Sequence, residues 1–136
     1  MEKTLEKTPH PKALQGLKLL LAEDYLDNQL LLSRGLKYLG AIVDVANDGQ
    51  EAVDKALRQD YDVILMDIEM PNLDGLEATK LLRAGYYKKP IIALTAHALR
   101  EEKENFSRSG FDDYVVKPLD RQLLVRAIQK ALHRAS

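Results

Sequence analysis

The sequence predicts an α/β fold in which helices cover both faces of a five-stranded parallel sheet. Two observations predict this class. Five short apolar runs alternate with five amphipathic stretches along the chain, and such alternation indicates a parallel sheet. Three of the runs, LKLLLA, VILM and PIIALT, are apolar almost throughout, which is typical of strands that are buried on both faces.

Each expected strand is an apolar run of strand length between turn or capping residues. The strands are expected at Leu17–Ala22, Ile42–Ala46, Val63–Met66, Ile91–Thr95 and Tyr114–Val116. The helices are expected at residues 27–39, 49–58, 74–84, 98–108 and 120–134. Right-handed crossovers leave few topologies for this pattern, and the strand order 2-1-3-4-5 is the common solution. The expected architecture is therefore three-layered, doubly wound and flavodoxin-like.

Local signals support the helix boundaries. Asp120 and Asp48 stand at the N-cap positions of the last and second helices, and Gly110 is placed to end the fourth helix in a left-handed conformation. The apolar residues of the last helix recur with the period of a core-facing helix. They are Leu124, Ala127, Ile128, Ala131 and Leu132. Because Pro9 and Pro11 discourage a helix, we expect residues 1–15 to be a flexible tail or linker and residues 16–136 to be the domain.

The composition narrows the class of function. The 136 residues carry a net charge of −1, which does not favour direct binding to nucleic acid, since that normally needs a basic face. There is no cysteine, so disulfides, thiolate metal sites and thiol catalysis are excluded. No apolar run reaches the ~18 residues of a membrane span, and the N-terminus has no apolar signal core. We therefore expect a cytoplasmic domain without direct membrane contact.

Three carboxylates are expected to converge at one edge of the sheet. In this topology, ligands bind beyond the carboxyl ends of strands 1 and 3, which lead into Glu23, Asp24 and Asp67. Crowded carboxylates repel one another unless a cation compensates, and oxygen ligands favour Mg²⁺ over zinc. Mn²⁺ is an alternative ion, and the backbone carbonyl of Glu69 is a further candidate ligand. The alternative is that these carboxylates only cap the following helices.

A hydroxyl and an ammonium are expected at the same edge, because strand 4 ends in Thr95 and strand 5 leads into Lys117. A bound phosphoryl group needs such a hydrogen-bond donor and compensating charge. A cis bond between Lys117 and Pro118 would aim the ammonium inward. An aspartate can attack phosphorus and form an aspartyl-phosphate, and we assign that role to Asp67, at the tip of the central strand.

Together these residues resemble the response-regulator receiver family. The similar segments are LLAED (20–24), VILMDIEMPNLDG (63–75), ALTAHA (93–98) and GFDDYVVKPL (110–119). The resemblance implies that Asp67 is phosphorylated in an autocatalytic, metal-dependent reaction. It implies that Glu23 and Asp24 bind the metal, that Thr95 is the switch hydroxyl and that Lys117 precedes a usually cis proline. Tyr114 matches the aromatic residue that changes rotamer on activation, altering the face of helix 4, strand 5 and helix 5.

The segments resemble most closely receivers of hybrid sensor histidine kinases. That resemblance implies a sensor histidine kinase, a histidine phosphotransfer domain or both as partners, and a parent chain that is a membrane-anchored kinase. The alternative is a stand-alone single-domain response regulator, and a homodimer through the helix 4–strand 5–helix 5 face stays open. His97, two residues after Thr95, is a candidate for lining the pocket and tuning hydrolysis.

Three other functions share some of these features. An aspartyl phosphatase needs a second acid two residues after the nucleophile, where this chain has Glu69, and usually a cap domain for which 136 residues leave no room. A flavin carrier needs a phosphate-cradling loop after strand 1, where this chain has the acidic EDYLDNQ. A non-catalytic interaction module would normally lack some of the site residues, which are all present here.

Overall fold

The computed structural model describes residues 10–96 and 100–135. Its strands are β1 (Lys18–Ala22), β2 (Ile42–Ala46), β3 (Val63–Asp67), β4 (Ile91–Thr95) and β5 (Asp113–Val116). They form one sheet in the order β2-β1-β3-β4-β5, and every pairing is parallel. The predicted topology is confirmed, and each strand lies within one residue of its predicted bounds.

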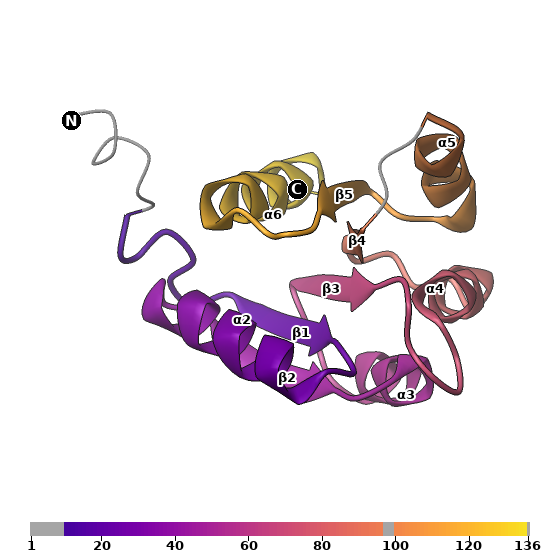
Figure 1. Ribbon diagram of the computed structural model, residues 1–136, viewed down its shortest axis with the longest axis horizontal. Helices are drawn as coiled ribbons and strands as arrows, with labels where there is room; N and C mark the ends of the chain where they lie inside the picture. The colour runs from indigo at the N-terminus through magenta and orange to yellow at the C-terminus, as the bar shows by residue number, and fades with distance from the viewer. Residues whose placement is uncertain (1–9, 97–99, 136) are drawn as a thin grey trace.

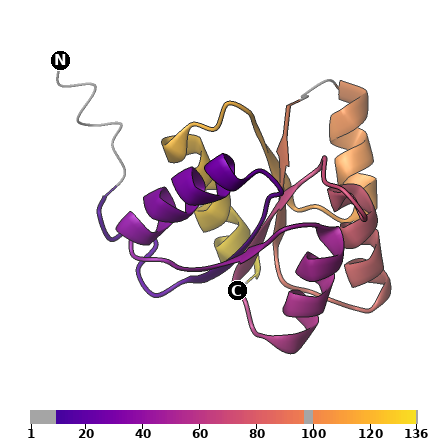
Figure 2. The same cartoon turned by 60° about the horizontal axis from the view of Figure 1, so that its bottom comes forward.

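Helices cover the sheet on both faces, as predicted (Figures 1 and 2). They are α2 (Leu26–Tyr38), α3 (Gly49–Arg58), α4 (Gly75–Ala84), α5 (Arg100–Ser109) and α6 (Arg121–Ala135). One buried cluster joins α2 and α6 to one face of the sheet, with Leu36 and Ile128 in it. A second cluster joins α3, α4 and α5 to the other face, with Ala52, Leu82 and Phe106 in it. The fourth helix was expected from residue 98, but residues 97–99 lie outside the described residues.

The predicted capping residues make the expected contacts. The Asp48 carboxylate accepts a hydrogen bond from the backbone N–H of Glu51 at 2.9 Å. Asp120 accepts one from the N–H of Gln122 at 2.8 Å. Gly110 has a φ of 105° after α5, a left-handed conformation that glycine adopts at little cost. The helix termini are therefore set by local side-chain chemistry, as the sequence indicates.

The strand register brings the ends of the central strands together. Ala22, the last residue of β1, pairs with Met66 of β3, so Glu23 and Asp67 follow side by side. On the other side of β3, Asp67 pairs with Leu94 of β4. Thr95 in turn pairs with Val116 of β5, which places Lys117 just beyond the same edge.

Residues 10–15, the described part of the expected tail, pack on the domain together with Gly16. Leu14 is completely buried and belongs to the cluster shared by α2 and α6. Its N–H donates to the carbonyl of Leu39 at 2.9 Å, and the N–H of Gly16 donates to the carbonyl of Gly40 at 3.0 Å. The two prolines do discourage a helix, but a segment without regular secondary structure can still bury an apolar side chain.

Within residues 10–96 and 100–135, no helix is both long and apolar enough to cross a membrane.

Candidate functional site

Three carboxylates meet at the carboxyl edge of the sheet, as the topology predicts. Glu23, Asp24 and Asp67 each offer one oxygen, and these oxygens all lie within 4.8 Å of one another. Glu23 is 1% exposed and Asp67 is 4% exposed, whereas Asp24 is exposed to solvent. The carboxylates of Glu23 and Asp67 are therefore buried away from water, where the repulsion between their negative charges is strongest.

Lys117 faces the two buried carboxylates. Its ammonium nitrogen lies 2.8 Å from Oδ2 of Asp67 and 3.6 Å from Oε1 of Glu23. The peptide bond between Lys117 and Pro118 is cis, in agreement with the prediction. The Lys117 N–H also donates to the carbonyl of Thr95 at 2.7 Å, which ties the loop after β5 to the end of β4.

Burial and the neighbouring charges shift the proton affinities of this group. Burial raises the pKa of Glu23 above its ordinary value, and the charge of Asp67 raises it further, although the N–H of Tyr25 and the Lys117 ammonium lower it. For Lys117, burial lowers the pKa, but the hydrogen bond to Asp67 and the charges of Asp67 and Glu23 outweigh it, so the pKa is raised. Lys117 is therefore a firmly protonated cation.

The donor set fits a hard divalent cation. Oε1 of Glu23 is buried and accepts no hydrogen bond from the described residues, which is costly for a carboxylate oxygen. The Glu23 carboxylate belongs to the cluster of three carboxylates, and oxygen-only ligands are those that Mg²⁺ prefers. Glu23, Asp24 and Asp67 are therefore able to hold such an ion. The backbone carbonyl of Glu69 stays a predicted further ligand.

The loop after β3 fixes the Asp67 carboxylate from its other side. The N–H of Glu69 donates to Oδ1 of Asp67 at 3.1 Å. Farther along, the N–H of Gly75 donates to the carbonyl of Ile68 at 2.9 Å. A methyl group on Gly75 would lie 2.1 Å from the carbonyl oxygen of Asp67, so only glycine allows this close approach.

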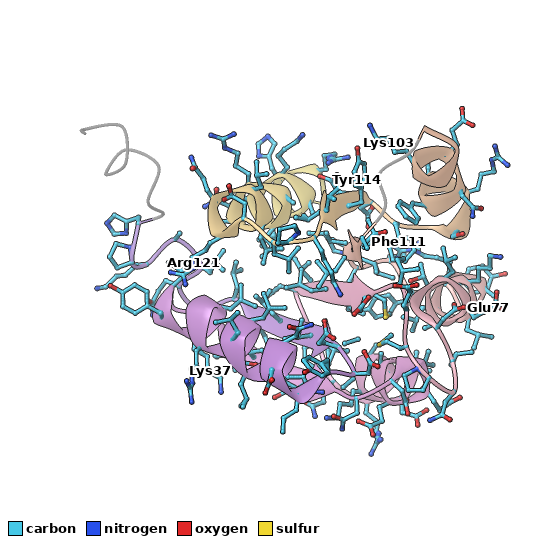
Figure 3. All side chains as sticks on the ribbon, viewed as in Figure 1. Lys37, Glu77, Lys103, Phe111, Tyr114 and Arg121 are labelled. Carbon is cyan, nitrogen blue, oxygen red and sulfur yellow. The ribbon has the colours of Figure 1, made fainter. Side chains whose placement is uncertain are left out.

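Thr95 and Tyr114 lie where the sequence places them. Thr95 is the last residue of β4 and is 3% exposed. Tyr114 is half-buried on β5, with its ring centroid 6.1 Å from that of Phe106 on α5. The Lys103 ammonium lies 5.5 Å from the Tyr114 ring centroid, and Figure 3 shows the two residues close together. His97 lies outside the described residues.

An apolar groove of about 360 Å³ opens beside the site, between α2 and the start of α6. Glu23 and Lys117 line it, and so do Leu31 and Gly35 of α2 and Arg121 of α6. Figure 3 shows Arg121 on the side of α6 that faces α2, and a methyl group on Gly35 would lie 3.4 Å from its guanidinium. The groove therefore continues from the carboxylates along α2.

Two polar residues near the carboxylates, Gln29 and Asn47, were not predicted from the sequence. Gln29 on α2 is only 8% exposed, and its side chain contacts Glu23 and Asn47. A signal was present in the sequence, because Gln29, Ser33 and Leu36 are spaced as one helical face. That face is the buried one, while Leu26, Leu30 and Leu31 are exposed, the reverse of what hydrophobicity suggests.

Comparisons with known proteins agree with this geometry. The sequence model of the response regulator receiver domain matches residues 19–129. The chain is 45% identical over 122 residues to the Hybrid signal transduction histidine kinase I of Dictyostelium discoideum, covering 82% of this chain and 7% of that protein. Other curated relatives are also much longer, with 9% of Sensor protein EvgS and 16% of Histidine kinase 5 covered.

Two solved structures share the fold. The receiver domain of the sensor histidine kinase PA1611 from Pseudomonas aeruginosa, with a magnesium ion in its active site cleft, is 43% identical, with a TM-score of 0.80 over 87% of this chain and 98% of that chain. The receiver domain of Ssk1 from Saccharomyces cerevisiae, solved with the histidine phosphotransfer protein Ypd1, is 29% identical, with a TM-score of 0.80 over 88% of this chain and 92% of that chain.

Proposed function

Because the chain belongs to the response regulator receiver domain family, and is thus the receiver domain of a two-component phosphorelay, we propose that it accepts a phosphoryl group on Asp67. One observation carries this assignment. Asp67 is the buried carboxylate that both belongs to the cluster of three and contacts the Lys117 ammonium at 2.8 Å. Glu23 shares the cluster but lies farther from the ammonium, at 3.6 Å, and Asp24 is exposed.

In the proposed reaction, a carboxylate oxygen of Asp67 attacks the phosphorus of a phosphohistidine. The new P–O bond forms as the P–N bond breaks, and the donor imidazole leaves with the electron pair of that bond. Lys117 stabilises the charge that develops on the phosphoryl oxygens, and the N–H of Glu69 holds Asp67 in position. When Mg²⁺, or Mn²⁺ as an alternative, is bound by Glu23, Asp24, Asp67 and the Glu69 carbonyl, it supplies further charge neutralisation.

The phosphorylated state is proposed to change the surface around β5. The Thr95 hydroxyl moves toward the new phosphoryl group, and Tyr114 turns into the space that Thr95 leaves. Such a switch needs two packings that differ by a few kcal/mol. The half-buried position of Tyr114 against Phe106 and Lys103 supports this proposal, because the ring is not locked in the core.

The proposed donor is a histidine phosphotransfer domain or a sensor histidine kinase, docked in the groove along α2. The groove shares Glu23 and Lys117 with the site, so a donor histidine seated there lies within reach of Asp67. Leu26, Leu30 and Leu31 of α2 are all exposed, and a cluster of exposed apolar side chains is typical of an interaction site. The complex of Ssk1 with Ypd1 shows that a similar domain binds such a partner.

The larger protein is proposed to be a hybrid sensor histidine kinase. The curated relatives are hybrid and sensor kinases much longer than this chain, which supports a receiver within a hybrid sensor histidine kinase over a stand-alone regulator. The cytoplasmic location, the absence of direct contact with nucleic acid or membrane, and a homodimer through α5, β5 and α6 stay predictions. The domain is proposed to begin within residues 10–16, where the buried Leu14 lies.

Incubation with acetyl phosphate and Mg²⁺, followed by intact-mass measurement, tests the proposed function. We expect a mass increase of one phosphoryl group, its loss when EDTA is added first, and its loss in Asp67→Asn. Glu69→Gln is the matched control, because it removes a neighbouring carboxylate but leaves the backbone N–H and carbonyl. Full labelling of Asp67→Asn would contradict the assignment.

The docking proposal has its own test. Leu31→Glu places a charge in the groove, and Leu57→Glu places one on α3, where Leu57 is similarly exposed at 65%. With phosphorylated Ypd1 as the donor, we expect Leu31→Glu to slow phosphotransfer and Leu57→Glu to leave it unchanged. Labelling by acetyl phosphate should be equal in both variants, since that small donor needs no groove. Equal rates from the protein donor would contradict the docking site.

A further inference from the structure

A buried amide on α2 touches the loop that carries the acidic pair. Gln29 is 8% exposed, in a position where a helix normally places an apolar side chain. Its Nε2 donates hydrogen bonds to the backbone carbonyl of Glu23 and, at 2.8 Å, to Oδ1 of Asn47. Burying an amide is costly unless its hydrogen bonds are made, and Gln29 makes two of them on residues that follow β1 and β2.

The hydrogen bonds continue from Asn47 to α3. Nδ2 and the backbone N–H of Asn47 both donate to Oε1 of Glu51, each at 3.0 Å. Glu51 lies in the first turn of α3, where its own N–H donates to the Asp48 cap at 2.9 Å. Gln29, Asn47 and Glu51 therefore form a hydrogen-bond relay that joins the end of β1, the end of β2, α2 and the N-terminus of α3.

The acceptors at the two ends of the relay determine which amide group donates and which accepts each hydrogen bond. A carboxylate and a backbone carbonyl only accept hydrogen bonds. Glu51 therefore requires the NH₂ group of Asn47, which turns Oδ1 of Asn47 toward Gln29. Gln29 must then present its NH₂ group, which also suits the carbonyl of Glu23. No other orientation of the two amides satisfies all the contacts, so the relay has a single arrangement.

The contact on Glu23 is directed at the peptide unit between the two metal-binding candidates. The carbonyl of Glu23 belongs to the planar peptide that joins Glu23 to Asp24, so holding that oxygen fixes the orientation of both residues. The same loop is also held by the N–H of Glu23, which donates to the carbonyl of Ala46 at 3.0 Å, and by the N–H of Tyr25, which donates to Oε2 of Glu23 at 3.1 Å.

We propose that Gln29 is a positioning residue for the divalent cation: through Asn47 and Glu51 it holds the Glu23–Asp24 peptide so that both carboxylates face Asp67. The inference rests on the proposed metal site. Groups that orient metal ligands typically change metal affinity about 10–100-fold when they are removed. Gln29 is placed to touch neither the cation nor the phosphoryl group, so its effect is on affinity for the ion and not on the chemical step.

Calorimetric titration of the whole chain with Mg²⁺ tests the proposal. Gln29→Leu keeps the approximate volume of the side chain and removes its NH₂ group. Ser33→Ala is the matched control, because Ser33 is equally buried at 8% on the same face of α2, one turn farther from Glu23. We expect the dissociation constant for Mg²⁺ to rise roughly 10-fold or more in Gln29→Leu and to stay within twofold of wild type in Ser33→Ala.

A second variant covers the case in which Gln29→Leu does not fold. Asn47 is exposed, so Asn47→Ala should fold, and it breaks the relay at its middle. We expect weaker Mg²⁺ binding there too, and less than additive losses in the double variant, because both changes remove the same restraint. With acetyl phosphate, the half-saturating Mg²⁺ concentration should rise while the rate at saturating Mg²⁺ stays close to wild type.

The outcomes separate this proposal from the one on which it rests. If wild type binds Mg²⁺ and both Gln29→Leu and Asn47→Ala bind it equally well, the positioning role is wrong and the metal site stands. A loss of rate at saturating Mg²⁺ with unchanged affinity would also overturn the positioning role. If wild type itself does not bind Mg²⁺, the proposed site and this inference both fail.

Discussion

The ammonium of Lys117 lies 2.8 Å from Oδ2 of Asp67, with the lysine 50 residues farther along the chain. This contact pairs a cation from the loop after β5 with a carboxylate at the end of β3, across the end of β4. It offsets the charge of a carboxylate that is 4% exposed. The same ammonium is then already in place to receive the phosphoryl group that we propose for Asp67.

Lys117→Gln should slow phosphorylation far more than it weakens cation binding. Loss of one preorganised donor to a developing charge typically costs about 10²–10³ in rate. The ammonium also competes with a cation for Asp67 and Glu23, so Mg²⁺ affinity should be retained. Rates of acetyl phosphate labelling and calorimetric Mg²⁺ titration measure the two effects. The exposed Lys130 supplies the control Lys130→Gln, and equal rates in the two variants would contradict the role of Lys117.

Gly75→Ala should displace Asp67, because the new methyl group would lie 2.1 Å from the Asp67 carbonyl oxygen. We expect a loss of about 1–3 kcal/mol in the free energy of unfolding, together with slower phosphorylation.

Gly85→Ala is the matched control for that change. A methyl group on Gly85 would lie 3.6 Å from its nearest neighbours, and the φ of −89° at this position suits alanine. The free energy of unfolding should therefore stay the same or rise by up to about 1 kcal/mol. Urea denaturation and labelling rates provide the comparison. If Gly75→Ala were as stable and as active as Gly85→Ala, the close approach of Gly75 to Asp67 would not be needed to position Asp67.

Tyr114 should respond to modification of Asp67 if it acts as a switch. Addition of beryllofluoride and Mg²⁺ should shift the backbone NMR signals of Thr95 and Tyr114. Lys103→Gln removes a cation above the Tyr114 ring, a contact worth about 0.5–1 kcal/mol at exposed sites, and should therefore make the ring easier to move. Unchanged signals at both residues, with Asp67 demonstrably modified, would rule out the switch.

Leu14→Ala should destabilise the domain, because Leu14 is completely buried between elements that include α2 and α6. The expected loss in the free energy of unfolding is about 2–5 kcal/mol. Lys12→Ala, at an exposed position in the same segment, should change stability by less than about 0.5 kcal/mol. Urea denaturation of the two variants decides whether residues 10–16 belong to the domain, and equal stabilities would show that they do not.

The fold could be predicted because each level of the sequence points to the same answer. Apolar runs mark the strands, Asp48 and Asp120 mark helix starts, and right-handed crossovers restrict the strand order. The meeting of Glu23, Asp24 and Asp67 followed from that order alone, since strands 1 and 3 are neighbours in it. Lys117 and Thr95 followed in the same way from their places after strand 5 and at the end of strand 4.

The missed features depend on contacts between distant residues. Gln29 is buried because a backbone carbonyl and Asn47 accept its hydrogen bonds, whereas the polarity of a glutamine side chain alone assigns it to the surface. Leu14 is buried because the end of α2 and α6 leave room for it, although the neighbouring prolines indicate a tail. In both cases local sequence signals correctly indicated the backbone conformation but did not identify the tertiary contacts that bury the side chain.

Chemical mapping of the phosphorylated residue shows whether Asp67 is the phosphoacceptor. Hydride reduces an acyl phosphate to an alcohol, so borohydride treatment of the labelled chain converts the modified aspartate to homoserine, which peptide mass spectrometry locates. We expect homoserine at position 67, formed only when Mg²⁺ was present during labelling. Homoserine at position 24, or a phosphoryl group that resists borohydride on another residue, would contradict it.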